Sequence, residues 1–133
     1  MALALEIVTP EQRVLTVEAD EVRLPAVDGS LGVRPGHTPL VAALGAGELV
    51  YVTGGVDHRY AVGEGFAEVS NDRVRVLVEE AVRAGDIDPA RAAGELREQQ
   101  AKLSAMKPDD PSYESQRAHV ERAAARSVVA SRR

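Results

Sequence analysis

The chain of 133 residues contains no cysteine and no tryptophan, and only 3% of its residues are aromatic. The absence of cysteine excludes a disulfide framework and thiolate metal sites. Few rings are present to stack on bases, and the formal net charge is −5, so the sequence lacks the basic surface typical of nucleic-acid-binding proteins. We therefore expect no nucleic-acid partner.

Long apolar segments are also missing. The longest interval without Asp, Glu, Lys or Arg, residues 35–47, is shorter than the ~18 residues that a membrane span requires, and prolines and glycines interrupt it. Near the N-terminus no basic leader precedes the apolar residues, and Glu6 interrupts them, so we expect no signal peptide. The chain is predicted not to insert directly into a membrane.

The first part of the sequence has the period of β-strands. In the stretch "DRVRVLVEE", Val74, Val76 and Val78 alternate with Arg73 and Arg75, which is typical of a strand with one buried face. Turn signals divide this part into short strands, at Asp28-Gly29, Gly54-Gly55 and Asn71-Asp72. We predict that residues 1–85 form a domain of about ten short strands, an antiparallel β-sandwich or flattened barrel.

Beyond this domain the pattern becomes helical. Asp88 is a good N-cap with Pro89 at the first helical position, and the Asp-Pro pair at 110–111 announces a second helix. Residues 86–133 are therefore predicted to form a second domain, an antiparallel helical hairpin, which makes the fold α+β. The predicted packing stripes are rich in small side chains: Ala92, Leu96, Leu103 and Met106 on the first helix, and Tyr113, Val120, Ala124 and Val128 on the second. Such a hairpin is either fixed on the sandwich or weakly held and able to extend.

Charge is divided unevenly between the two parts. Residues 1–85 carry thirteen acidic and seven basic residues, whereas residues 86–133 carry eight acidic and nine basic residues. The basic second helix either seeks an acidic partner or simply presents a solvated face.

No local signature of catalysis is present. His37, His58 and His119 are far apart and show no metal-ligand spacing, and the sequence contains no phosphate-binding loop and no nucleophile elbow. The stretch "VGEGFAEV" only imitates a dinucleotide motif and is interpreted as a turn between strands. We therefore expect no catalytic residues, no metal and no enzyme. Two alternatives stay open: a small hydrolase with a site assembled from distant residues, and a free-standing β-sandwich adaptor whose helical tail docks on a partner.

Three stretches together resemble the epsilon subunit family of bacterial F-type ATP synthases: "DGSLGVRPGHTPLVAAL" (28–44), "VGEGFAEVSNDRVRVLVEEA" (62–81) and "AGDIDPARA" (84–92). The resemblance implies a non-catalytic rotor subunit of the central stalk that couples the gamma subunit to the membrane c-ring during proton-driven ATP synthesis. It also implies a peripheral position on the cytoplasmic face of the bacterial plasma membrane. The implied contacts to the gamma subunit or the c-ring are Ser30, Leu31, Gly32, Arg34, Pro35 and His37. Ser30 departs from the glutamate that many members carry there.

The resemblance also implies a regulatory role for the hairpin. In family members the helices lie compact on the sandwich or extend into the catalytic head, where basic residues meet an acidic segment of the beta subunit, with the alpha subunit nearby, and block ATP hydrolysis. The corresponding residues here are Arg117, Arg122 and Arg126.

Some members bind ATP as a regulatory ligand, although no cofactor is required. The residues that match their motif are Ile87, Asp88, Arg91 and Ala92, with Arg122 and Arg126 on the second helix. Val82 and Glu98 depart from the nucleotide-binding pattern. The alternative is purely structural, because Asp88 is already explained as an N-cap and Arg91 lies one turn on, where it can pair with the Asp88 carboxylate.

Overall fold

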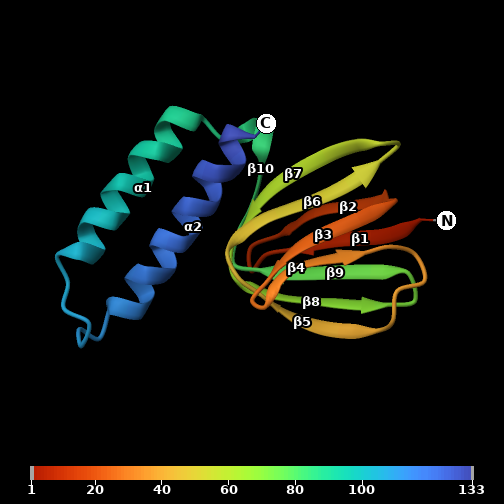
Figure 1. The fold of residues 1–133 in the computed structure, drawn as a ribbon, viewed down its shortest axis with the longest axis horizontal. Coiled ribbons are helices and arrows are strands. Elements are labelled where there is room, and N and C mark those ends of the chain that lie inside the picture. The colour runs from red at the N-terminus through yellow and green to blue at the C-terminus, as the bar shows by residue number, and fades with distance from the viewer. Residues whose placement is uncertain (1, 133) are drawn as a thin grey trace.

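The computed structural model describes residues 2–132 and shows a β-sandwich followed by two packed α-helices (Figure 1). The fold class predicted from the sequence is therefore confirmed. The strands are β1 (Leu3–Val8), β2 (Arg13–Ala19), β3 (Glu21–Ala26), β4 (Gly29–Val33), β5 (Leu40–Leu44), β6 (Gly47–Thr53), β7 (Val56–Val62), β8 (Gly65–Ser70), β9 (Arg73–Val78) and β10 (Ala81–Arg83). A 3₁₀ helix, η1 (Ala84–Asp86), leads to α1 (Pro89–Ser104) and α2 (Tyr113–Ser131).

The ten strands form one hydrogen-bonded sheet that folds over on itself. Its order is β10-β7-β6-β3-β5-β8-β9-β1-β2, with β4 paired to β3. Neighbouring strands are antiparallel except β1 and β9, which are parallel. The predicted turn in "VGEGFAEV" is confirmed, since β7 ends at Val62 and β8 begins at Gly65.

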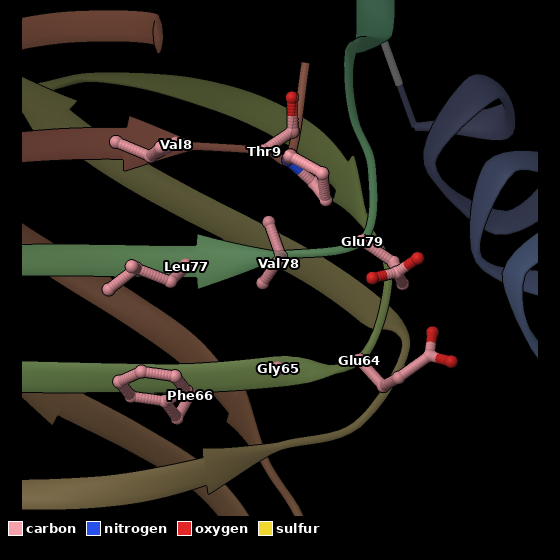
Figure 2. A pocket seen from close by; sticks show the side chains of 9 residues that line it. Val8, Thr9, Glu64, Gly65, Phe66, Leu77, Val78 and Glu79 are labelled. Atoms are coloured by element: carbon pink, nitrogen blue, oxygen red, sulfur yellow. The ribbon is translucent and has the colours of Figure 1, made fainter. Parts of the chain in front are cut away.

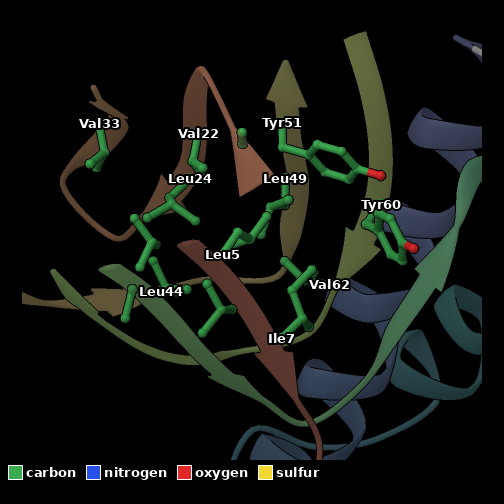
Figure 3. Close-up of a cluster of buried hydrophobic side chains, with 14 of the residues drawn as sticks. Leu5, Ile7, Val22, Leu24, Val33, Leu44, Leu49, Tyr51, Tyr60 and Val62 are labelled. Atoms are coloured by element: carbon green, nitrogen blue, oxygen red, sulfur yellow. The ribbon is translucent and has the colours of Figure 1, made fainter. Parts of the chain in front are cut away.

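Alternating burial explains why these segments form strands. Along β1, Leu3, Leu5 and Ile7 are fully buried, and along β9 Val74 and Val76 are fully buried. Figure 3 shows side chains from several strands meeting in one cluster between the two layers. Each fully buried aliphatic side chain contributes roughly 2 kcal/mol through the area it removes from water, so this cluster is the main source of stability of the sandwich.

The hairpin begins as the sequence predicted. The Asp88 side chain accepts hydrogen bonds from the backbone N–H groups of Ala90 (3.0 Å) and Arg91 (3.5 Å), which caps α1. The second helix starts slightly later than its Asp-Pro signal, at Tyr113, because Asp110 instead accepts a hydrogen bond from the Ser112 N–H (2.8 Å) in the preceding turn.

The helix α2 lies between α1 and the sandwich, and it contacts β6, β7 and η1 (Figure 1). A small apolar cluster joins the three parts, made of Ala61, Ala84, Ile87, Ala92, Val129 and Ala130, with Val82 against it. The predicted packing position at Val128 is wrong: this side chain is 46% exposed, whereas the adjacent Val129 is fully buried. The last turn of α2 packs on the sandwich as well as on α1. Its buried side is therefore shifted by one residue from the predicted stripe.

The division into domains 1–85 and 86–133 stays a prediction, although the last strand ends at Arg83 and α1 begins at Pro89.

Candidate functional site

The hairpin is held on the sandwich by two arginines of α2. Arg122 donates to both carboxylate oxygens of Glu64, with Nη1 at 3.0 Å from Oε1 and 2.8 Å from Oε2. Glu64 lies in the turn between β7 and β8, 58 residues earlier in the chain. The Arg122 side chain is only 16% exposed, so this contact is partly desolvated and stronger than an ordinary surface ion pair.

Arg126 makes the second contact, one helical turn further along α2. Its Nη1 donates to Glu80, which follows β9, and its Nη2 lies 3.9 Å from Glu95 on α1. The same Glu80 carboxylate lies 3.8 Å from Nε of Arg122. We call these five residues, Glu64, Glu80, Glu95, Arg122 and Arg126, the arginine clamp. It joins both helices to one end of the sandwich.

Arg117 is not part of the arginine clamp. It pairs with Glu114 (3.1 Å) and Glu121 (3.9 Å) on its own helix, and its side chain is 57% exposed. Of the three arginines predicted to meet a partner, Arg122 and Arg126 are therefore paired with the sandwich, whereas Arg117 faces solvent.

The predicted nucleotide-binding residues partly converge. A hollow of about 200 Å³ lies between η1, α1 and α2, and we call it the motif pocket. Five of the predicted residues are in its lining, together with the carboxylates of Asp86 and Glu95: Ile87, Asp88, Arg91, Ala92 and Arg126. Arg122 does not line it. Arg91 pairs with Glu95 (3.1 Å) rather than with Asp88, so the structural alternative explains Asp88 as a cap but is wrong about its pairing with Arg91. Val82 lines the hollow and Glu98 does not.

The predicted docking segment is held by contacts within the turn and to more distant parts of the sandwich. Ser30, Leu31 and Gly32 lie in β4, and the turn that follows is closed by a hydrogen bond from the His37 N–H to the Arg34 carbonyl oxygen (3.1 Å). Gly36 has a φ of 84°, which glycine adopts without strain, and its N–H donates to Asp72 (2.7 Å). Arg34 is exposed and reaches Glu21 (3.3 Å). Pro35 lies beside it in the same turn.

Sequence reasoning missed an apolar row on the outer face of the sheet. Cross-strand pairing aligns Ala43, Phe66, Leu77 and Val8 across β5, β8, β9 and β1. Phe66, the single phenylalanine of the chain, is 43% exposed, and nearby Val41 is 71% exposed. Figure 2 shows Val8, Leu77 and Phe66 beside a hollow of about 320 Å³. The only hint of this row in the sequence was the single phenylalanine. The residues beside it are set by the register of the strands, which the sequence does not reveal.

The residues that the structure describes form neither a metal-ligand cluster nor a membrane-spanning helix. Among residues 2–132, no three His, Asp or Glu side chains are grouped closely enough to hold a metal ion. Neither of the two helices in this range is long and apolar enough to span a membrane.

Comparison with known proteins places this chain. Residues 2–84 match the family model described as "ATP synthase, Delta/Epsilon chain, beta-sandwich domain". Over 132 residues the chain is 50% identical to the ATP synthase epsilon chain of Anaeromyxobacter sp. (strain K), covering 99% of this chain and 100% of that one. The chain belongs to the ATP synthase epsilon chain family. The epsilon chain of Geobacter metallireducens is 42% identical over 128 residues, covering 96% and 93% of the two chains.

Solved structures share the fold of this epsilon chain at low sequence identity. A chain from the mitochondrial ATP synthase of Euglena gracilis aligns with a TM-score of 0.81 and 24% identity, covering 99% of this chain and 82% of that one. A chain from the mitochondrial ATP synthase of Tetrahymena thermophila aligns with a TM-score of 0.66 and 12% identity, covering 98% and 97%.

Family membership settles the question of catalysis. Epsilon chains are non-catalytic subunits of ATP synthase, so the expectation that this chain is not an enzyme is confirmed. The small-hydrolase alternative is therefore wrong, and the free-standing adaptor loses its support.

Proposed function

We propose that this epsilon chain is a rotor subunit of the central stalk, coupling the gamma subunit to the c-ring, and that its C-terminal helices inhibit ATP hydrolysis. The observation that carries the proposal is the arginine clamp, in which Arg122 and Arg126 are paired with Glu64 and Glu80 of the sandwich. These are two of the three arginines expected to meet an acidic segment of the beta subunit.

Arg122 and Arg126 cannot pair with the sandwich and with another subunit at the same time. A guanidinium group that donates to Glu64 or Glu80 is not available to a carboxylate of another subunit, so the helices must leave the sandwich before both arginines engage the beta or alpha subunits. The arginines lose the carboxylates of the sandwich and gain those of the beta subunit, so the number of ion pairs changes little. The apolar contact to be broken is small, since four of the six buried side chains in the joining cluster are alanines.

The sandwich has two surfaces that suit docking on the gamma subunit or the c-ring. The ordered turn that carries Arg34 and His37 suits docking, because its backbone is already fixed before a partner binds. The apolar row through Phe66 is a second surface that suits burial against the gamma subunit. The Tetrahymena relative comes from a structure described as central stalk and c-ring. As part of this proposal, the chain is a peripheral protein on the cytoplasmic face of the bacterial plasma membrane.

A titration of ATP hydrolysis tests the proposal. Increasing amounts of the full chain, or of a version ending at Gly85, are added to an alpha-beta-gamma complex that lacks epsilon. We expect the full chain to lower the hydrolysis rate by roughly fivefold or more, a typical size for coupling between sites, and the shortened chain to bind without inhibition. Binding is measured separately by co-sedimentation.

The controls separate anchoring from inhibition. Circular dichroism verifies that the shortened chain is folded, which also tests the predicted boundary at residue 85. If both folded versions bind and neither inhibits, the regulatory part of the proposal is wrong; if neither binds, the rotor assignment itself fails.

We further propose that the motif pocket binds ATP and favours the compact hairpin, since Arg91 from α1 and Arg126 from α2 both line it. Isothermal titration calorimetry with ATP should show saturable heat, and Arg91→Gln should weaken binding roughly tenfold through loss of a charged hydrogen bond. Arg97→Gln removes an exposed arginine of the same helix that does not line the pocket, so it serves as the control. No saturation at millimolar ATP would contradict regulatory binding and would leave the clamp itself unaffected.

A further inference from the structure

A second polar cleft lies at the other end of the contact between the helices and the sandwich. It has a volume of about 570 Å³, within the range of small-molecule sites, and it is bounded by β6, β7, η1 and the end of α2. Its lining includes three arginines and three rings: Arg59, Arg83, Arg132, Tyr51, His58 and Tyr60. We call it the arginine–tyrosine cleft. It shares no lining residue with the motif pocket.

Two of the arginines meet at one carboxylate. Nη1 of Arg59 and Nη1 of Arg132 lie 3.2 Å and 3.1 Å from the same oxygen, Oε1 of Glu48. Arg59 also contacts Asp57 (3.3 Å), which lines the cleft. Each guanidinium group has five N–H donors, and the shared Glu48 oxygen accepts from only one donor of each. Donors of both arginines therefore remain for a ligand.

The third arginine is weakly held. Arg83 pairs with Asp86 at 3.3 Å, but the two side chains are 64% and 62% exposed. Asp86 raises the pKa of Arg83 above its ordinary value, so the guanidinium is charged at every physiological pH. Exposed ion pairs contribute little, so an anion that contacts several arginines at once can displace this carboxylate.

Aromatic side chains also line the cleft. Two of the three tyrosines of the chain lie here, and the rings of Tyr51 and His58 are stacked with centroids 4.6 Å apart. The ring centroids of Tyr60 and Tyr51 are 6.3 Å apart, and Tyr60 is 6% exposed. Figure 3 shows Tyr51 and Tyr60 at the border of the core cluster. Burial raises the pKa of Tyr60, so its hydroxyl stays protonated and can donate a hydrogen bond.

We propose that the arginine–tyrosine cleft binds a phosphate group, held by Arg59, Arg83 and Arg132. Guanidinium groups match phosphate oxygens in geometry as well as charge. The phosphate is either free or part of a nucleotide, and only a nucleotide brings a base that can lie beside His58, the least buried of the three rings.

Occupancy of the cleft affects the hairpin. Arg132 directly follows α2, whereas Arg59 belongs to β7 and Arg83 ends β10, so a bound phosphate bridges the end of the helix to the sandwich. A ligand that binds only the compact form stabilises that form. This consequence rests on the proposed mobility of the hairpin; the binding itself does not.

The test is a titration of the full chain followed by NMR, with the His58 ring signals as the reporter. The protein carries Arg91→Gln throughout, which weakens binding at the motif pocket. His58 lines the arginine–tyrosine cleft and not the motif pocket, so its signals report on the cleft. Inorganic phosphate is expected to shift the His58 signals saturably, while chloride at matched ionic strength does not. Arg83→Gln and Arg132→Gln should each weaken phosphate binding roughly tenfold, and the double variant should abolish it.

The control variant is Arg97→Gln, which removes an exposed arginine outside the cleft and should leave binding unchanged. Titration with ADP identifies the source of the phosphate: roughly tenfold tighter binding than inorganic phosphate supports a nucleotide, and equal binding supports free phosphate. Absence of saturable His58 shifts, or equal affinity in the arginine variants, overturns the proposal. Because no ATP hydrolysis is measured, this outcome is independent of the proposed inhibitory function.

Discussion

Replacing Val129 with aspartate is expected to release the helices from the sandwich. Val129 is fully buried in the small cluster that joins α2 to β7, η1 and α1. An unpaired carboxylate in this position weakens the docking of the helices by about 3 kcal/mol or more. The alanines around it offer no compensating hydrogen bond from their side chains. Hydrogen exchange measured by mass spectrometry should show α2 losing protection while β6 and β9 keep theirs.

Val128→Asp is the matched control. The two valines are adjacent in sequence, but Val128 is 46% exposed, so a carboxylate there stays hydrated and should leave the protection of α2 nearly unchanged. Equal loss of protection in both variants would contradict the structure of the last helical turn. Loss of protection throughout the sandwich in Val129→Asp would contradict the view that the helices can leave it intact.

Under the proposed function, Val129→Asp should also be a stronger inhibitor of ATP hydrolysis than the unchanged chain. The substitution removes the competing contact on the sandwich and leaves Arg117, Arg122 and Arg126 available to the beta subunit. Hydrogen exchange tests the hairpin contact alone, so a released helix that fails to inhibit would count against the regulatory proposal and not against the structure.

Replacing Gly65 with alanine is expected to destabilise the sandwich itself. Gly65 begins β8 and is paired with Leu44 on one side and Val78 on the other. A Cβ atom there would overlap the Leu77 carbonyl oxygen and lie 2.8 Å from the Val78 Cα. Both obstacles are backbone atoms, so the strands must move apart; we expect a loss of about 3 kcal/mol, which lowers Tm by roughly 10 °C. Thermal unfolding followed by circular dichroism measures it.

Gly45→Ala provides the comparison for this loss. A Cβ atom at Gly45 meets nothing within 4 Å, and the substitution keeps the backbone N–H that donates to Pro25 (2.9 Å). The change in stability should be within about 0.5 kcal/mol. Similar unfolding temperatures for the two variants would show that β8 and β9 are less closely packed at Gly65 than described.

The cap at Asp88 shows how far local chemistry reaches. An aspartate followed by proline satisfies the first N–H groups of a helix whatever surrounds it, and α1 begins at Pro89 as predicted. The second Asp-Pro pair was less informative, because Asp110 closes a turn and α2 begins at Tyr113. Val128 illustrates a different limit: helical period alone defines a stripe, but the neighbour that covers the stripe sets its exact direction.

Contacts between distant residues were beyond the reach of the sequence. Nothing in the local pattern pairs Arg122 with Glu64 or brings Arg132 to the oxygen of Glu48 that Arg59 also contacts. The apolar row through Phe66 likewise depends on the register of four strands. These charges and apolar side chains were visible in the sequence, but their partners were not.

By itself the sequence determined the elements: strands from alternation, turns from glycine and asparagine, helix starts from capping residues, and the family from three short stretches. These features depend on residues close together in the chain, whose geometry is fixed by local backbone and side-chain preferences. Only the tertiary structure decided that α2 faces the sandwich with Val129, and that its arginines are engaged there. The reason is that burial and charge pairing depend on distances in space, which the packing of the whole chain sets.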